Sequence, residues 1–88
     1  MFEVMVVKLH KDVIKKLRKL PRKIEEKFYD RVDLFIINKF DKLSTNHSVD
    51  SVYPNCHSIN ITGDYRAIYR EREGIITFMY IGTHSELY

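Results

Sequence analysis

Apolar residues in the first half of the chain follow two different spacings, and each spacing predicts one kind of element. Residues Phe2–Val7 form a mostly apolar and β-branched run, which is typical of a strand. From His10 to Lys19 the apolar residues return every three or four positions, which predicts an amphipathic helix with a basic outer face. Pro21 fits a first helical turn but not a helix interior, so a second helix is predicted from near Pro21 to about Asn38. The apolar stripes of the two helices are Leu9, Val13, Leu17 and Leu20, then Ile24, Phe28, Val32, Phe35 and Ile36.

The second half of the chain shows the alternation that strands require. It begins at His57–Ile61 and continues in the runs Tyr65–Arg70 and Ile75–Ile81. The preceding segment, residues 41–55, is polar and contains Pro54, which predicts mostly loop. The last run is apolar at nearly every position, as expected of a strand in the middle of a sheet or covered on both faces.

Short turns separate the three predicted strands, at Thr62–Asp64 and just before Ile75. Such turns join antiparallel neighbours. The predicted order is therefore β-α-α-β-β-β, an α+β fold in which an antiparallel sheet packs against a two-helix hairpin. With 88 residues, the chain is expected to form a single domain over residues 1–88.

Positive charge is concentrated near the amino terminus. The net charge is +3, but residues Lys8–Lys23 contain eight lysines and arginines against one acid, Asp12. That segment carries +7 and the rest of the chain −4. This concentration favours a polyanionic partner, nucleic acid first, although a solvated helix face explains it equally well.

The cysteine content bears on the cellular compartment, and the absence of known sequence motifs bears on which metal or cofactor sites to expect. The single cysteine, Cys56, excludes an internal disulfide, and no signal peptide is recognisable, so we expect a reducing, cytoplasmic location. No apolar run approaches the roughly 20 residues of a membrane span, so no membrane association is expected. The sequence has no Cys/His cluster at zinc spacing, no Gly-rich phosphate loop and no serine-nucleophile elbow, and we predict no cofactor.

Two predicted strand ends carry the residue types that RNA cleavage requires. Alternation places Asp64 and Arg66 on one face of their strand, and His84 follows the neighbouring strand. Cleavage needs a base for the 2′-hydroxyl, an acid for the 5′-oxygen and positive charge at the phosphate. Histidine can serve either proton role, and His47 in the polar loop would be a second proton carrier. Tyr88 could stack on a base.

Each of these residues also has a plain structural explanation. Asp64 follows Gly63 in a turn, where aspartate is common for backbone reasons alone. Asp64 and Arg66 could form a surface ion pair of little consequence. His47 could simply be exposed in its loop. No single residue among them is a specific signal.

Two segments taken together resemble a known family. The sequence SINITGDYRAIYR at Ser58–Arg70, followed by IGTHSELY at Ile81–Tyr88, resembles the RelE/ParE superfamily of type II toxins. The likeness is strongest to its YafQ-like branch of messenger-RNA interferases. It is close over Ser58–Tyr88 and weaker over the helical hairpin, and NHSV at residues 46–49 resembles the family's Asn-His-x-Leu segment. The family has the same β-α-α-β-β-β order.

The resemblance implies a ribosome-dependent endoribonuclease that cleaves messenger RNA in the A site by metal-independent attack of a 2′-hydroxyl. His84, Asp64, His47, Arg66 and Tyr88 match functional positions of the family. The resemblance also implies a cognate antitoxin as partner, besides the ribosome and messenger RNA, and we expect the free toxin to be monomeric. The basic face of the first helix would meet ribosomal RNA through Lys15, Lys16, Arg18, Lys19, Arg22 and Lys23.

The sequence departs from this branch at positions that bear on activity. Asn60 stands where the namesake of the branch has a histidine, and Tyr80 where it has an arginine. The segment before His57 also lacks a cation that many relatives carry, which could attenuate catalysis. Two alternatives stay open: a ParE-like toxin that inhibits gyrase without catalysis, and a relative that keeps only antitoxin binding. The Gly-Thr-His sequence at residues 82–84 counts against the gyrase inhibitor.

Overall fold

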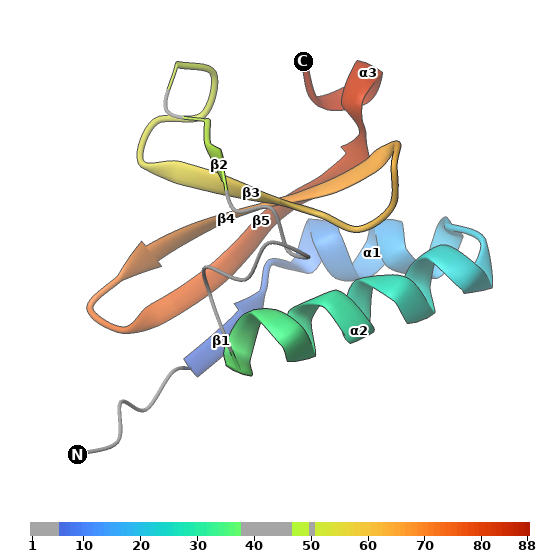
Figure 1. The fold of residues 1–88 in the computed structure, drawn as a ribbon, viewed down its shortest axis with the longest axis horizontal. Coiled ribbons are helices and arrows are strands. Elements are labelled where there is room, and N and C mark those ends of the chain that lie inside the picture. Colours follow the sequence, from blue (N-terminus) through green and yellow to red (C-terminus); the bar gives the residue numbers. More distant parts are fainter. Residues whose placement is uncertain (1–5, 38–46, 50) are drawn as a thin grey trace.

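Strands and helices follow one another in the predicted order, with two additions. The computed structural model describes residues 6–37, 47–49 and 51–88. The additions are β2, in a segment predicted as loop, and α3, at a chain end where no helix was predicted (Figure 1). The elements are β1 (Val6–Leu9), α1 (Lys11–Lys19), α2 (Arg22–Ile37), β2 (His47–Ser48), β3 (Cys56–Asn60), β4 (Tyr65–Arg72), β5 (Ile75–Thr83) and α3 (His84–Leu87).

The strands form one sheet in the order β1-β5-β4-β3-β2 (Figure 1). β5 lies between two neighbours, as its apolar sequence predicted. The pairs β2–β3, β3–β4 and β4–β5 are antiparallel, whereas β1 pairs with β5 in parallel. The prediction of a wholly antiparallel sheet is therefore wrong at β1. Parallel neighbours need a long crossover connection, and the helical hairpin and the intervening strands provide one. Of the predicted strand Phe2–Val7, only Val6 and Val7 are described, and β1 continues to Leu9.

Local sequence determines where the two long helices begin. His10 precedes α1, and its Nδ1 accepts a hydrogen bond from the backbone N–H of Asp12 at 3.1 Å, so His10 caps the helix. Pro21 precedes α2, and its carbonyl oxygen accepts the backbone N–H of Glu25 at 3.1 Å. The break predicted at Pro21 is thus confirmed. α2 is described as far as Ile37, and its predicted end one residue later lies outside the described residues.

The main hydrophobic core lies between the helical hairpin and one face of the sheet. Phe28 packs edge-to-face on Phe78 with ring centroids 5.5 Å apart, and Phe35 packs against Tyr69 at 4.7 Å. The predicted inward position of Ile36 is wrong, because its side chain is 44% exposed. It lies about 100° round the helix from Phe35 and so outside the buried stripe. The buried members of the core are Val13, Leu17, Phe28, Val32, Phe35, Ile59, Ile61, Ala67, Tyr69, Ile76, Phe78 and Ile81.

A β-bulge in β5 changes which side chains face this core. The β4 partners of Phe78 and Tyr80 are adjacent residues, so Met79 is an extra residue in β5. An extra residue shifts the alternation of the strand by one position. Phe78 and Ile81 consequently both belong to the main core, whereas the Tyr80 side chain is 45% exposed.

A smaller cluster covers the opposite face of the sheet. It consists of Cys56, Ile68 and Leu87, with Val49 and Tyr53 packed against it. Ile68 and its β4 neighbours Ala67 and Tyr69 therefore face opposite sides, as alternation predicted. Figure 1 shows the sheet between α2 and the short α3, so α3 belongs to the face that the long helices leave free.

Candidate active site

The start of β4 and the end of β5 bring three predicted site residues together. His84 directly follows β5, and its backbone N–H donates to the carbonyl oxygen of Asp64 at 3.0 Å. Arg66 pairs with Gly82, two residues before His84. The ladder between the two strands thus holds residues 64, 66 and 84 at one end of the sheet.

Asp64 lies in an exposed turn. The hydroxyl oxygen of Thr62 accepts the backbone N–H groups of Asp64 and Tyr65, at 3.3 and 3.1 Å, and this shapes the predicted turn. Within the described part of the chain, the Asp64 carboxylate forms no ion pair, with Arg66 or any other base. The surface ion pair considered from the sequence is therefore not formed, and the carboxylate faces solvent.

Arg66 has a hydrogen-bond donor that the described residues do not use. Its Nε is buried and has no acceptor, and on the facing position of β3 the Oδ1 of Asn60 is buried without a donor. Buried polar groups are normally paired. An external anion cannot reach Nε while this atom is buried, but the Arg66 residue as a whole is only half-buried, and a guanidinium has four further N–H donors that suit a phosphate.

The last residues of the chain form a single helical turn with a built-in cap. Thr83 Oγ1 accepts the backbone N–H of Glu86 at 3.2 Å, and Glu86 Oε1 accepts the backbone N–H of Thr83 at 2.8 Å. This is a capping box. The Thr83-x-x-Glu86 spacing was a sequence signal for α3 that the analysis of periodicity missed. His84 opens the turn, and the backbone N–H of Tyr88 closes it on the His84 carbonyl at 3.0 Å.

Aromatic rings surround this turn. The rings of His84 and Tyr88 lie 4.8 Å apart, and Tyr53 lies 4.9 Å from Tyr80 and 6.1 Å from Tyr88. The Tyr53 hydroxyl donates to the carbonyl oxygen of Leu87 at 2.5 Å. Burial raises the pKa of Tyr53, and Tyr88 and Tyr80 raise it further, so the hydroxyl keeps the proton that it donates. No local signal singled out Tyr53, because it lies in a segment predicted as loop.

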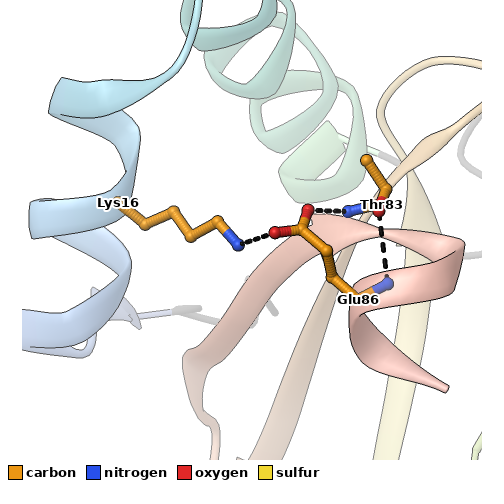
Figure 2. Close-up of polar contacts among 3 residues, drawn as sticks. All are labelled: Lys16, Thr83 and Glu86. Carbon is orange, nitrogen blue, oxygen red and sulfur yellow. Dashed lines mark hydrogen bonds and ion pairs between the residues drawn. The ribbon is translucent and has the colours of Figure 1, made fainter.

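Lys16 of α1 reaches the same turn. Its Nζ lies 2.8 Å from Oε2 of Glu86, as Figure 2 shows. This hydrogen bond, followed by those from Thr83, lowers the pKa of Glu86 to about 2. A hollow of about 250 Å³ lies beside the pair, and Asp12, Tyr53 and Tyr80 also line it. Lys16 was predicted to bind RNA, but in this structure its ammonium group is occupied by a carboxylate of the chain itself.

The rest of the predicted basic surface is exposed. Arg22 forms an ion pair with Glu26 at 3.2 Å. Lys15 and Lys19 border a second hollow of about 380 Å³, which Lys16 also lines. Among the residues that the structure describes, no ion pair occupies Lys15, Arg18, Lys19 or Lys23. The basic outer face of α1 is confirmed, and its binding to RNA stays a prediction.

His47 lies on a strand that is two positions away from β4 in the sheet. It belongs to β2, where its backbone pairs with Ser58 of β3. β3 separates it from β4, and two strand spacings amount to about 10 Å. The His47 side chain lies outside the described residues, so its catalytic role stays a prediction.

The described residues contain neither a metal-binding cluster nor a membrane-spanning helix. Among residues 6–37, 47–49 and 51–88, no three His, Cys, Asp or Glu side chains gather as they would around a metal ion. No helix in the same residues has the length and hydropathy to cross a membrane.

Comparison with known families gives a match over nearly the whole chain. Residues 7–88 match the family described as the ParE toxin of the type II toxin-antitoxin system parDE. A comparison with curated protein sequences finds no match.

Solved structures share the fold at low sequence identity. YafQ from Escherichia coli has a TM-score of 0.79 at 16% identity, covering 97% of this chain and 99% of that one. YafQ in the E. coli DinJ–YafQ complex has a TM-score of 0.76 at 16% identity, covering 96% and 97%. The archaeal RelE–RelB complex from Pyrococcus horikoshii gives a TM-score of 0.62 at 20% identity, covering 90% and 93%. These matches confirm the predicted RelE-like α+β fold.

Proposed function

The chain belongs to the ParE toxin family, within the RelE/ParE superfamily of type II toxins, and we propose that it is an endoribonuclease that cleaves messenger RNA in the ribosomal A site. A 2′-oxygen attacks the adjacent phosphorus, the P–O5′ bond breaks, and a 2′,3′-cyclic phosphate remains. The substrate supplies the nucleophile, so the reaction needs no metal. One observation carries the proposal: the backbone hydrogen bond from His84 to Asp64 and the pairing of Arg66 with Gly82 bring these three residues to one end of the sheet, which we call the junction.

The residues at this junction match the demands of the reaction. His84 and Asp64 are both exposed and can exchange protons with a bound substrate, one taking the 2′-hydroxyl proton and the other protonating the 5′-oxygen. Arg66 stabilises the charge that develops on the phosphate oxygens. Tyr88, 43% exposed and next to the His84 ring, stacks on a base of the codon.

The wider surface supports binding to a ribosome. Lys15, Arg18, Lys19 and Lys23 are exposed and form no ion pair among the described residues, so they are available to contact ribosomal RNA. Such contacts weaken steeply with salt concentration.

A cognate antitoxin is the second proposed partner. DinJ–YafQ and RelE–RelB are complexes of similarly folded proteins, which supports such a partner for this chain in the cytoplasm. An acidic antitoxin segment would suit the basic face of α1.

Primer extension on a translated message, with and without ribosomes, tests the nuclease. We expect cuts at codon boundaries only with ribosomes, and their loss in His84→Ala. His57→Ala is the matched control, because His57 is an exposed histidine of β3 that stacks on Tyr69 outside the junction. Undiminished cutting by His84→Ala, with unchanged circular dichroism, would exclude His84 from the reaction.

The match to the ParE family favours a second candidate function, inhibition of gyrase without catalysis. In that case the message stays intact while plasmid DNA loses its negative supercoiling in expressing cells. The same cultures supply both measurements, so the two candidates are separated directly.

A further inference from the structure

Helix α3, which begins at His84 and is followed by Tyr88, is too short to be stable by itself. α3 has four residues, and forming an isolated helical turn is unfavourable because few hydrogen bonds compensate for the ordered backbone. Its position must therefore come from contacts with other elements. Those contacts include the backbone hydrogen bond from His84 to Asp64, the buried Leu87 side chain, the Tyr53 hydroxyl and the carboxylate of Glu86.

The Glu86 carboxylate has a different partner on each oxygen. Oε1 accepts the backbone N–H of Thr83 at 2.8 Å, and Oε2 accepts Lys16 Nζ at 2.8 Å (Figure 2). One carboxylate thus ties the first turn of α3 to the end of β5 and to α1. Lys16 and Glu86 are seventy positions apart, so this tie exists only in the folded chain.

Gly82 shows how closely this bridge lies on the strand. A Cβ atom at position 82 would lie 3.3 Å from Oε1 of Glu86 and 3.3 Å from Nζ of Lys16. Both distances are tighter than ordinary carbon contacts, so with a side chain at residue 82 the ion pair would have to shift by a few tenths of an ångström. Glycine at this position leaves room for the bridge.

We propose that Glu86, held by Lys16, is a positioning residue that fixes where His84 and Tyr88 lie. The inference rests on the proposed nuclease function for its kinetic consequence. It assigns Lys16 a different task from the other lysines of α1: Lys16 orders the cleavage site, whereas Lys15 and Lys19 remain free for RNA.

The Lys16–Glu86 ion pair is proposed to position His84 and Tyr88, and it contributes little to the stability of the whole fold. The side chains of Lys16 and Glu86 are 35% and 48% exposed, and exposed ion pairs stabilise a fold only slightly. Variants of the pair should therefore fold. Misplacing a reacting group by about 1 Å can nevertheless cost up to about 100-fold in rate.

Neighbouring lysines provide the matched test. In Lys16→Met we expect kcat for ribosome-dependent cleavage to fall about ten-fold with little change in KM. In Lys15→Met, which removes the same charge from the same helix, we expect KM to rise with kcat unchanged. Lys16→Arg should restore kcat to within about two-fold, because a guanidinium can donate to the same carboxylate. Equal changes in KM for the two methionine variants, with kcat unchanged, would overturn the proposal.

Three further variants separate the effect of the Lys16–Glu86 ion pair from the effect of the Lys16 charge alone. Glu86→Gln keeps an acceptor for Thr83 and removes the ion pair, so it should lower kcat, and Lys16→Met/Glu86→Gln should be no slower than the slower single variant. Gly82→Ala shifts the pair by a few tenths of an ångström without removing a charge, so it should lower kcat less than Lys16→Met does. Additive losses in the double variant would show that the two residues act separately, contrary to the proposal.

NMR of the free protein tests whether Lys16 positions the His84 and Tyr88 rings, and this test does not depend on nuclease activity. We expect the close contact between the His84 and Tyr88 rings in the parent protein and in Lys15→Met, and its loss in Lys16→Met. An unchanged contact in Lys16→Met refutes the positioning role. A parent protein that shows the contact and its dependence on Lys16 but cleaves no message would instead refute the proposed function alone.

Discussion

On the side of the sheet that faces α1 and α2, Phe28, Phe35 and Phe78 are fully buried and packed ring against ring. At the far end of β5, α3 is held by one buried leucine and a few hydrogen bonds, and His84 and Tyr88 remain exposed. Dense apolar packing is costly to interrupt, because removing a buried side chain leaves a cavity. Holding α3 by a few hydrogen bonds leaves His84 and Tyr88 accessible, but the position of each then depends on individual hydrogen bonds. The molecule thus separates the region that keeps it folded from the region that carries the proposed site.

Removing a core ring should produce the largest effect on stability. Phe35→Ala leaves a cavity at a fully buried position and should lower the free energy of unfolding by about 3–5 kcal/mol. Urea denaturation followed by circular dichroism measures it. Ile36→Ala, at the exposed neighbouring position, should cost less than about 1 kcal/mol. Similar losses in the two variants would contradict the described packing.

Asp64→Asn should affect activity without affecting stability. The carboxylate is exposed and unpaired within the described residues, so the urea midpoint should not move. Cleavage should slow by about 100-fold if Asp64 transfers a proton. Asp33→Asn, at an exposed position of α2, provides the control for loss of charge. A stable variant with full activity would remove Asp64 from the site.

Tyr53→Phe should loosen α3 by a smaller amount. The change removes only the hydroxyl that donates to the Leu87 carbonyl and keeps the ring contacts. One such hydrogen bond contributes about 0.5–1.5 kcal/mol. Amide hydrogen exchange should accelerate in α3 and stay unchanged in α2. Uniform acceleration across the chain would indicate a general loss of stability instead.

Protonation should break the ion pair between Glu86 and Lys16 only at low pH, and we expect this to be the smallest of the predicted effects. Because the pKa of Glu86 is lowered from 4.5 to about 2, its contribution is fully present above about pH 4.5 and is lost as pH falls toward 2. Lys16 and Asp12 are the charged groups beside it. Carboxyl NMR titration should give a midpoint near 2 in the parent protein and a higher one in Lys16→Met. A midpoint that does not change would show that the ion pair is absent in solution.

Much of the candidate site was predictable, because strand alternation and turn sequences are patterns that span only a few residues. Alternation along β4 and a tight turn after Thr62 are enough to place Asp64 and Arg66 near the end of the next strand. His84, directly after the neighbouring strand, and the aromatic Tyr88 were also candidates from the sequence, and the family resemblance then matched both to functional positions. Tyr53 could not be found in this way, since its partner Leu87 is 34 positions away and no local repeat marks it.

The sequence by itself determined the helical hairpin, the strands β3 to β5 and the basic face of α1, because periodicity and turn chemistry act over a few residues. Only the tertiary structure decided that β1 runs parallel to β5, that Met79 forms a bulge and that Lys16 binds Glu86. These features join residues far apart along the chain. Their free energy depends on which partner the whole fold brings within reach, and no local pattern encodes that choice.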